Sequence, residues 1–167
     1  MRLVASNFDD TTNAWTDSSG NNRNIAGTAT TSTTGNIRGN PTLVDTTGTA
    51  LAPANGSTAI FKTVKGGTTD GIVLGNEALT KYTLCHVARY AGATRDRIFA
   101  GVTGNWLSGY WSNRVGVAYH EGWITSASGP SDTDWRVMCD TGGGESGLRS
   151  NGVIKTTVTT NATGLTA

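Results

Sequence analysis

Short runs of large apolar side chains alternate with turn residues from residue 59 onward. Gly, Asn, Asp or Ser separate these runs at a spacing of roughly ten residues, which is typical of a β-sandwich or a β-barrel. Residues 1–58 are richer in turn residues, and the segment 28–35 is of low complexity. We expect short strands at 60–64, 72–74, 82–90, 97–101, 105–111, 115–120 and 135–139.

Two of these runs alternate in the way that a strand does when one face packs on a core. In 115–119 the odd positions carry the large apolar groups, and Trp135, Val137 and Cys139 share one face of the run 135–139. The run 82–90 is apolar on both faces, which favours a central strand.

One tight turn is predicted directly. Asn151-Gly152 separates the strand-like runs 147–150 and 153–156. A two-residue type I′ hairpin needs positive φ at both turn positions, and Asn followed by Gly supplies them most readily.

Composition supports an all-β chain. The 167 residues include 29 Thr, 23 Gly, 13 Asn and 12 Ser, but three Glu and four Lys. Thr favours strands, Gly and Asn favour turns, and the strongest helix formers are scarce. The formal charge of +1 indicates no general attraction to nucleic acid or an anionic membrane. No stretch approaches the length of about 18 apolar residues that a spanning helix needs. We therefore expect no nucleic-acid partner and no membrane insertion.

The two cysteines and two histidines suggest structural roles. Cys85 and Cys139 lie inside apolar runs, so we expect buried free thiols, with a disulfide as the alternative. His86 lies within the most apolar run and is expected to be an interior histidine. His120 is followed by Glu121, and such a pair at a strand end is a weak acid–base candidate.

Aromatic residues gather between Trp106 and Trp123, which makes this segment the candidate binding site. On a strand over 105–111, Trp106 and Tyr110 share one face and Trp111 lies on the other. Rings exposed in a row stack on the apolar faces of sugars, whereas the alternative is that they fill the core. The candidate ligand-binding residues are Trp111, Tyr110, Trp123, Asn113 and Arg114.

Arginines and aspartates leave two alternatives open. Four arginines, Arg89, Arg95, Arg97 and Arg114, could hold an anionic glycan, or could be solvated charges paired with Asp96 or Glu121. Loop aspartates at positions 9, 10, 17, 132 and 134 could bind Ca²⁺, or could simply cap turns. The histidines and cysteines have no zinc-ligand spacing, so we expect no metal or other cofactor from them.

Motifs for catalysis are lacking in the sequence. Glycoside hydrolysis needs two carboxyl groups beside the scissile bond, but Glu77, Glu121 and Glu145 stand apart from one another. No nucleophile elbow or phosphate-binding loop occurs either. We therefore expect a protein that is not an enzyme.

Five stretches carry a family resemblance. Residues 15–22, WTDSSGNN, resemble the W-x-D-x-S-G-N signature of laminin-G-type, concanavalin A-like domains. The stretches YTLCHVARY at 82–90, RIF at 97–99, NWLSGYW at 105–111 and GVAYHEGW at 116–123 are similar to a subgroup from large DNA viruses of algae. The resemblance covers about residues 15–158. The length of 167 residues and the lack of a linker predict a single domain over 1–167. The resemblance implies a jelly-roll sandwich of two antiparallel sheets.

The resemblance also implies a role. It indicates a lectin-like or structural module on a virion surface or outside the cell, with carbohydrate or neighbouring virion proteins as partners. The alternatives are a minor capsid or fibre component that binds no glycan, or a polysaccharide-cleaving enzyme of the same fold. The chain lacks the Glu-x-Asp-x-x-Glu strand of the laminarinase-like enzymes, which disfavours the latter. It also lacks the Trp-bearing closing strand, so we expect that strand to be replaced or to lie in a longer protein.

Overall fold

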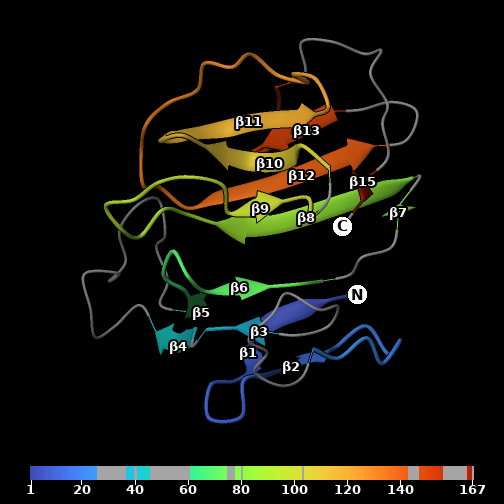
Figure 1. Cartoon of the computed structure of the whole chain (residues 1–167), viewed down its shortest axis with the longest axis vertical. Coiled ribbons are helices and arrows are strands. Elements are labelled where there is room, and N and C mark those ends of the chain that lie inside the picture. The colour runs from blue at the N-terminus through green and yellow to red at the C-terminus, as the bar shows by residue number, and fades with distance from the viewer. Residues whose placement is uncertain are drawn as a thin grey trace. The chain divides into compact units, whose positions relative to one another are not determined.

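The computed structural model describes a protein made of antiparallel strands (Figure 1). The described residues are 1–25, 37–39, 41–45, 61–74, 78–79, 81–102, 104–142, 147–155 and 165–166. Over these ranges the chain forms strands β1 to β15 and no helix, which confirms the all-β class. Accordingly, no helix in the described part of the chain is long and apolar enough to cross a membrane.

The chain divides into two compact units, Met1–Asn76 and Glu77–Ala167, which are described in turn. The expectation of a single domain over 1–167 stays a prediction. The low-complexity segment 28–35, together with Glu77 and Glu145, lies outside the described residues.

Three strand pairs build the first unit. They are β1 (Leu3–Asp9) with β2 (Ala14–Asp17), β3 (Ile37–Arg38) with β6 (Gly71–Ile72), and β4 (Thr42–Asp45) with β5 (Lys62–Lys65). Phe8 and Ile25 form the centre of its small core, with apolar side chains from β1, β2, β4, β5 and β6 packed against them.

The segment 15–22, which the sequence analysis compared with the W-x-D-x-S-G-N signature, runs from the end of β2 into a turn organised by Asp17. The Asp17 carboxylate accepts hydrogen bonds from the backbone N–H groups of Arg2 (2.7 Å) and Ser19 (2.9 Å) and from the Ser19 hydroxyl (2.8 Å). These bonds, the Arg2 amide foremost, hold the pKa of Asp17 well below its usual value. Trp15 packs its ring edge-on against Phe8, with centroids 5.5 Å apart. Asp17 therefore stabilises the turn, and Trp15 stabilises the small core.

Two sheets and one short strand pair build the second unit. One sheet has the order β11 (Arg114–His120), β10 (Trp106–Trp111), β9 (Phe99–Ala100). The other has the order β14 (Val153–Ile154), β13 (Gly147–Ser150), β12 (Arg136–Gly142), β8 (Tyr82–Ala88). The short pair joins β7 (Ala78–Leu79) to β15 (Leu165–Thr166).

The two sheets of the second unit pack face to face. Tyr110, Val115 and Ala118 from β10 and β11 meet Met138 and Leu148 from β12 and β13 in one buried cluster. This is a sandwich-like arrangement, in which each sheet buries one face against the other (Figure 1).

A β-bulge changes which side chains of β11 reach the core. Gly109 pairs with Val117, but the next residue, Tyr110, pairs with Val115, so Gly116 is the extra residue. Gly116 has φ +74°, a conformation that glycine adopts without steric cost. Val115 belongs to the core cluster, whereas Val117, which pairs with Gly109, does not. The prediction that the odd positions of 115–119 share one face was wrong, because the bulge reverses the alternation.

The faces of β12 were predicted the wrong way round. Alternation is present, but the fully buried side chains are Met138 and Asp140, while Val137 is 54% exposed. Nor is β8 a central strand: it is at one end of the described four-stranded sheet, and Val87 is 56% exposed. The apolar groups that suggested a core face lie on the outer surface of this sheet.

The cysteines correct another expectation. Cys85 and Cys139 are directly opposite each other on β8 and β12 and form a disulfide, and the described residues contain no free cysteine. Cys85 is exposed and Cys139 half-buried, so neither is a buried thiol. Their register explains the bond, because directly opposed positions of antiparallel strands bring the two Cβ atoms close.

The Asn151-Gly152 hairpin is confirmed. Both turn residues have positive φ, 49° and 79°, and the flanking Ser150 and Val153 pair directly. A second two-residue hairpin joins β10 to β11 through Ser112 and Asn113, with φ values of 46° and 64°.

Candidate functional site

A group of half-buried aromatic rings lies on the face of β10 and β11 that points away from the sandwich core. Trp123 is the middle ring of the group, with its centroid 5.1 Å from that of Trp111 and 5.3 Å from that of Tyr119. Both contacts are edge-to-face, a favourable geometry for aromatic rings. The three rings therefore form a preorganised apolar surface.

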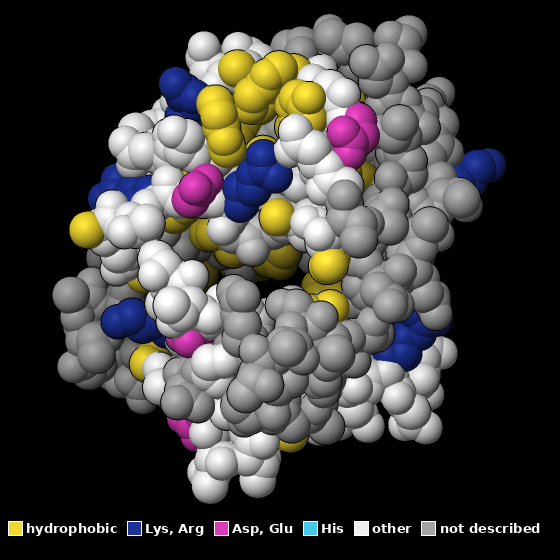
Figure 2. All heavy atoms as spheres, viewed as in Figure 1, with side chains coloured by type: hydrophobic (Ala, Val, Ile, Leu, Met, Phe, Trp, Pro, Cys, Tyr) yellow, Lys and Arg dark blue, Asp and Glu magenta, His cyan; other side chains and the backbone are white. Residues whose placement is uncertain are grey.

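These rings border a small cavity of about 150 Å³, which we call the aromatic cleft. Its lining residues are Arg97, Asn105, Leu107, Trp111, Tyr119 and Trp123. Leu107 is almost fully buried, at 1% exposure, so it forms an apolar floor. Figure 2 shows hydrophobic side chains gathered beside charged ones over the part of the molecule where Figure 1 draws β10 and β11.

Polar groups line one edge of the aromatic cleft. The Arg97 guanidinium donates a hydrogen bond to Oδ1 of Asn105 (2.8 Å), and both residues are exposed. The Glu121 carboxylate accepts a hydrogen bond from the backbone N–H of Asn105. The cleft thus joins an apolar wall to an edge that carries hydrogen-bond donors and acceptors, the usual composition of a polar-ligand site.

The chain reaches this geometry through a tight turn after β11. The backbone N–H of His120 donates to the carbonyl of Gly122 (2.8 Å), and Glu121 has φ +53°. This turn brings Trp123 back beside Tyr119, with which it forms a β-bridge. The turn, rather than strand alternation, therefore places the middle ring.

Four of the five predicted ligand-binding residues lie at or beside the cleft. Trp111 and Trp123 line it, and the Arg114 guanidinium lies 4.9 Å from the centre of the Trp111 ring. Asn113 is exposed in the adjoining hairpin, where it accepts a hydrogen bond from Arg95 (3.1 Å).

Tyr110 is not part of the cleft, so its assignment to the binding site was wrong. Its side chain is fully buried, and its hydroxyl donates to the carbonyl of Ala88 in the opposite sheet. The reason is strand alternation: Tyr110 follows the face of Trp106 into the core, while Trp111 points outward, as predicted.

Sequence reasoning missed four lining residues. Tyr119 and Leu107 are directly opposite each other in the β10–β11 register, so a correct hairpin alignment would have placed both beside Trp111. Arg97 and Asn105 come from segments around β9, and only the tertiary structure brings them to the cleft. The sequence had marked Arg97 only as one of four arginines that could hold an anionic glycan, and no signal in the sequence identifies Asn105.

A second, more open hollow adjoins the first. Residues 93–96 and the hairpin residues Ser112 and Asn113 line it. The linings of the two hollows are continuous along the chain at two places. Asp96 lines the second hollow and Arg97 the aromatic cleft, and Ser112 lines the second hollow and Trp111 the aromatic cleft. A ligand in the aromatic cleft could therefore continue toward Arg95.

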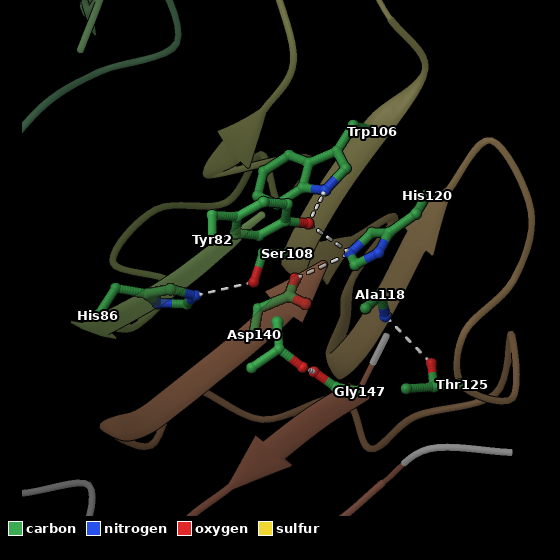
Figure 3. A network of polar contacts seen from close by, with 10 residues as sticks. Tyr82, His86, Trp106, Ser108, Ala118, His120, Thr125, Asp140 and Gly147 are labelled. Atoms are coloured by element: carbon green, nitrogen blue, oxygen red, sulfur yellow. Dashed lines mark hydrogen bonds and ion pairs between the residues drawn. The ribbon is translucent and has the colours of Figure 1, made fainter. Parts of the chain in front are cut away.

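Residues of catalytic type gather elsewhere, between the two sheets (Figure 3). His120 Nε2 lies 3.1 Å from Oδ2 of Asp140, and His86 Nε2 lies 3.1 Å from the Ser108 hydroxyl. Tyr82 lies beside them and accepts a hydrogen bond from the Trp106 indole (2.7 Å). The Trp106 ring also stacks on His120 at an interplanar angle of 16°.

Burial governs the ionisation of this network. Burial lowers the pKa of His86 to about 4. Burial also raises the pKa of Asp140, and hydrogen bonds from His120 and Ser108 partly offset this rise. Ser108, His120 and Asp140 have no exposed surface. The network joins the sheets, and the interior role expected of His86 is confirmed.

The His120–Glu121 pair does not form an acid–base site. His120 points into the core toward Asp140, whereas Glu121 points outward to the backbone of Asn105. Glu121 lies in the turn after β11, with φ +53°, and this turn directs its side chain away from that of His120.

Three of the aspartates considered for calcium, Asp9, Asp17 and Asp132, cap turns, whereas Asp10 accepts a hydrogen bond from the backbone N–H of Leu43. Asp9 accepts hydrogen bonds from the backbone of Thr11 and Thr12, and Asp132 accepts from Asp134. Over the described ranges, no group of three or more His, Cys, Asp or Glu side chains could hold a metal ion.

Comparison of the chain with protein families, with curated proteins and with solved structures finds no match.

Proposed function

We propose that this protein is a non-enzymatic, lectin-like module that binds carbohydrate in the aromatic cleft. One observation carries the proposal: three half-buried rings, Trp111, Tyr119 and Trp123, surround a cavity whose edge holds Arg97 and Asn105. The C–H faces of a sugar ring pack on aromatic faces, and its hydroxyl groups exchange hydrogen bonds with amide and guanidinium groups.

The size of the cleft suits one ring of a longer sugar chain. Its volume of about 150 Å³ is smaller than the roughly 300 Å³ at which pockets for drug-sized ligands begin. A binder of this kind recognises a terminal or protruding sugar and reaches useful avidity when several copies are displayed together.

The absence of catalysis is part of the proposal. The described acid–base residues, His86, His120 and Asp140, are at most 8% exposed, so a substrate could not reach them. Beside the cleft, the Glu121 carboxylate is engaged with a backbone N–H group, and no carboxylate is among the described residues that line the cavity. Hydrolysis of a glycosidic bond would need two.

A jelly-roll fold and a place on the surface of a virion belong to the same proposal. Their support is the sequence resemblance over residues 15–158 and the sandwich-like packing of the second unit. Display on a particle would make the weak binding of a single cleft effective.

The test is calorimetric titration of the full chain with polysaccharides from candidate host surfaces. We expect Trp123→Ala and Trp111→Ala each to weaken binding about thirty-fold or more, the usual effect of truncating a central aromatic contact. Trp135→Ala is the matched control, because Trp135 also lies beside an arginine, Arg89, but does not line the cleft. It should leave the affinity unchanged.

Two outcomes would contradict the proposal. Wild-type protein that binds no glycan at millimolar concentration would exclude a lectin. If Trp111→Ala instead impaired particle assembly with no effect on glycan, the cleft would belong to a purely structural component.

A further inference from the structure

We infer that the glycan bound at the aromatic cleft is anionic, carrying sulfate or carboxylate groups. This inference rests on the proposed function and names its ligand class. Three guanidinium groups surround the cleft and the adjoining hollow: those of Arg95, Arg97 and Arg114. Guanidinium is the side-chain group best matched to planar anions, because it can donate two parallel hydrogen bonds.

The three guanidinium groups are held by neutral partners. Arg97 donates to the Asn105 side chain, and Arg95 to the side chain of Asn113 and the carbonyl of Gly92. Arg114 lies over the Trp111 ring. In the described ranges the ion pairs are His120–Asp140 and Arg136–Asp132, and neither includes these arginines. Their charge is therefore available to a ligand.

The two nearby carboxylates form no ion pair with these arginines in the described part of the chain. Asp96 accepts a hydrogen bond from the backbone N–H of Arg97 (2.9 Å), and Glu121 accepts one from that of Asn105. These contacts tie the two carboxylates to the backbone of the loops that carry the cleft, and not to a guanidinium group. Of the two alternatives that the sequence left open, this geometry favours arginines that bind a ligand over arginines paired with Asp96 or Glu121.

The arrangement also fixes how an anionic chain would lie. One sugar ring in the aromatic cleft would place its substituents near Arg97 at one edge and Arg114 above Trp111. The next sugar would extend into the adjoining hollow, where Arg95 and Asn113 offer donors. A ligand of two or more sugars with repeated negative charge uses all three arginines.

The experiment compares polysaccharides that differ only in charge. Dextran sulfate is titrated against dextran, and polygalacturonate against its methyl ester, with the full chain at two salt concentrations. We expect at least one anionic form to bind about ten-fold or more tightly than its neutral counterpart. This difference in affinity between the anionic and the neutral form should become smaller at high salt, because exposed charges are screened. Which pair shows this difference distinguishes sulfate from carboxylate.

Variants locate the effect. Arg97→Gln and Arg114→Gln should each reduce the preference for the anionic form, and Trp123→Ala should weaken both forms. Arg89→Gln is the control, since Arg89 contacts Trp135 and the Thr133 carbonyl instead of the cleft.

Several results would overturn the inference. Equal affinity for charged and neutral forms would leave a lectin with a neutral ligand. An effect of Arg89→Gln as large as that of Arg97→Gln, or no effect of Trp123→Ala, would mean general attraction to polyanions. Equal binding of a single-stranded oligonucleotide would indicate a nucleic-acid ligand. Absence of binding to any glycan would refute the proposed function itself.

Discussion

Replacing both cysteines, Cys85→Ser with Cys139→Ser, should destabilise the protein by about 4 kcal/mol. The disulfide closes a loop with a sequence separation of 54 residues. The chain-entropy model gives an entropy loss of about 14 cal/mol/K for the unfolded chain with a loop of that length, which is about 4 kcal/mol at 25 °C. Both sulfurs lie on the outer surface of the β8–β12 pair, so serine leaves no cavity in the core.

Urea unfolding of the oxidised wild type and the double variant measures the difference. Thiol titration of the denatured, unreduced wild type should find no free thiol. A neighbouring pair provides the matched control: Val87 and Val137 are also directly opposite each other and more than half exposed. Their joint replacement by serine changes the same surface without removing a cross-link, and should cost about 1 kcal/mol, the span of strand propensities.

Two results would refute this reasoning. Detection of two thiols in the unreduced wild type would show that the bond does not form. A loss in the double cysteine variant no larger than in the valine control would show that the cross-link adds nothing beyond ordinary strand pairing.

Three further predictions concern stability. Gly152→Val should cost about 1–3 kcal/mol, because a β-branched residue is strained at φ +79°; an unchanged melting temperature would contradict this. Gly109→Ala should cost more than Gly152→Ala in the same melting assay, since its Cβ would lie 2.7 Å from the Met138 sulfur, whereas no atom lies within 4 Å at position 152. Equal costs would mean that the core adapts freely. The pKa of His86 falls from 6.5 to about 4 on folding, so the unfolded state binds more protons between these pH values. The contribution of His86 to the free energy of unfolding should therefore fall by about 2 kcal/mol between pH 7 and pH 4.5. The raised pKa of Asp140 changes stability with pH in the opposite direction. The measurement is therefore the difference in unfolding free energy between wild type and His86→Gln, from urea unfolding at each pH. If this difference did not change with pH, the lowered pKa of His86 would be disproved.

Local chemistry made part of the fold predictable. Asn151-Gly152 was identifiable as a hairpin because the turn needs positive φ at two successive positions, which is a property of the dipeptide itself. Trp111 and Tyr110 were assigned to opposite faces for an equally local reason, the two-residue period of a strand.

Predictions from the two-residue period of a strand failed where a bulge interrupts the alternation or where apolar residues lie on the outer face. Gly116 inserts one residue into β11, and every side chain before the bulge then changes face relative to those after it. On β12 the apolar residues Val137 and Cys139 face outward and the core side contains Asp140, because His120 in the opposite sheet compensates the buried carboxylate. Such compensation depends on a partner 20 residues away and leaves no local signal.

The strand-rich class, the Asn-Gly turn and the aromatic segment that contributes Trp111 and Trp123 could be predicted from the amino-acid sequence, since each depends on residue type or on neighbours along the chain. Tertiary structure alone decided the disulfide, the burial of Tyr110 and the arrival of Arg97 and Asn105 at the cleft. These features depend on strand register and sheet packing, and a shift of one residue in register turns a side chain from one face to the other.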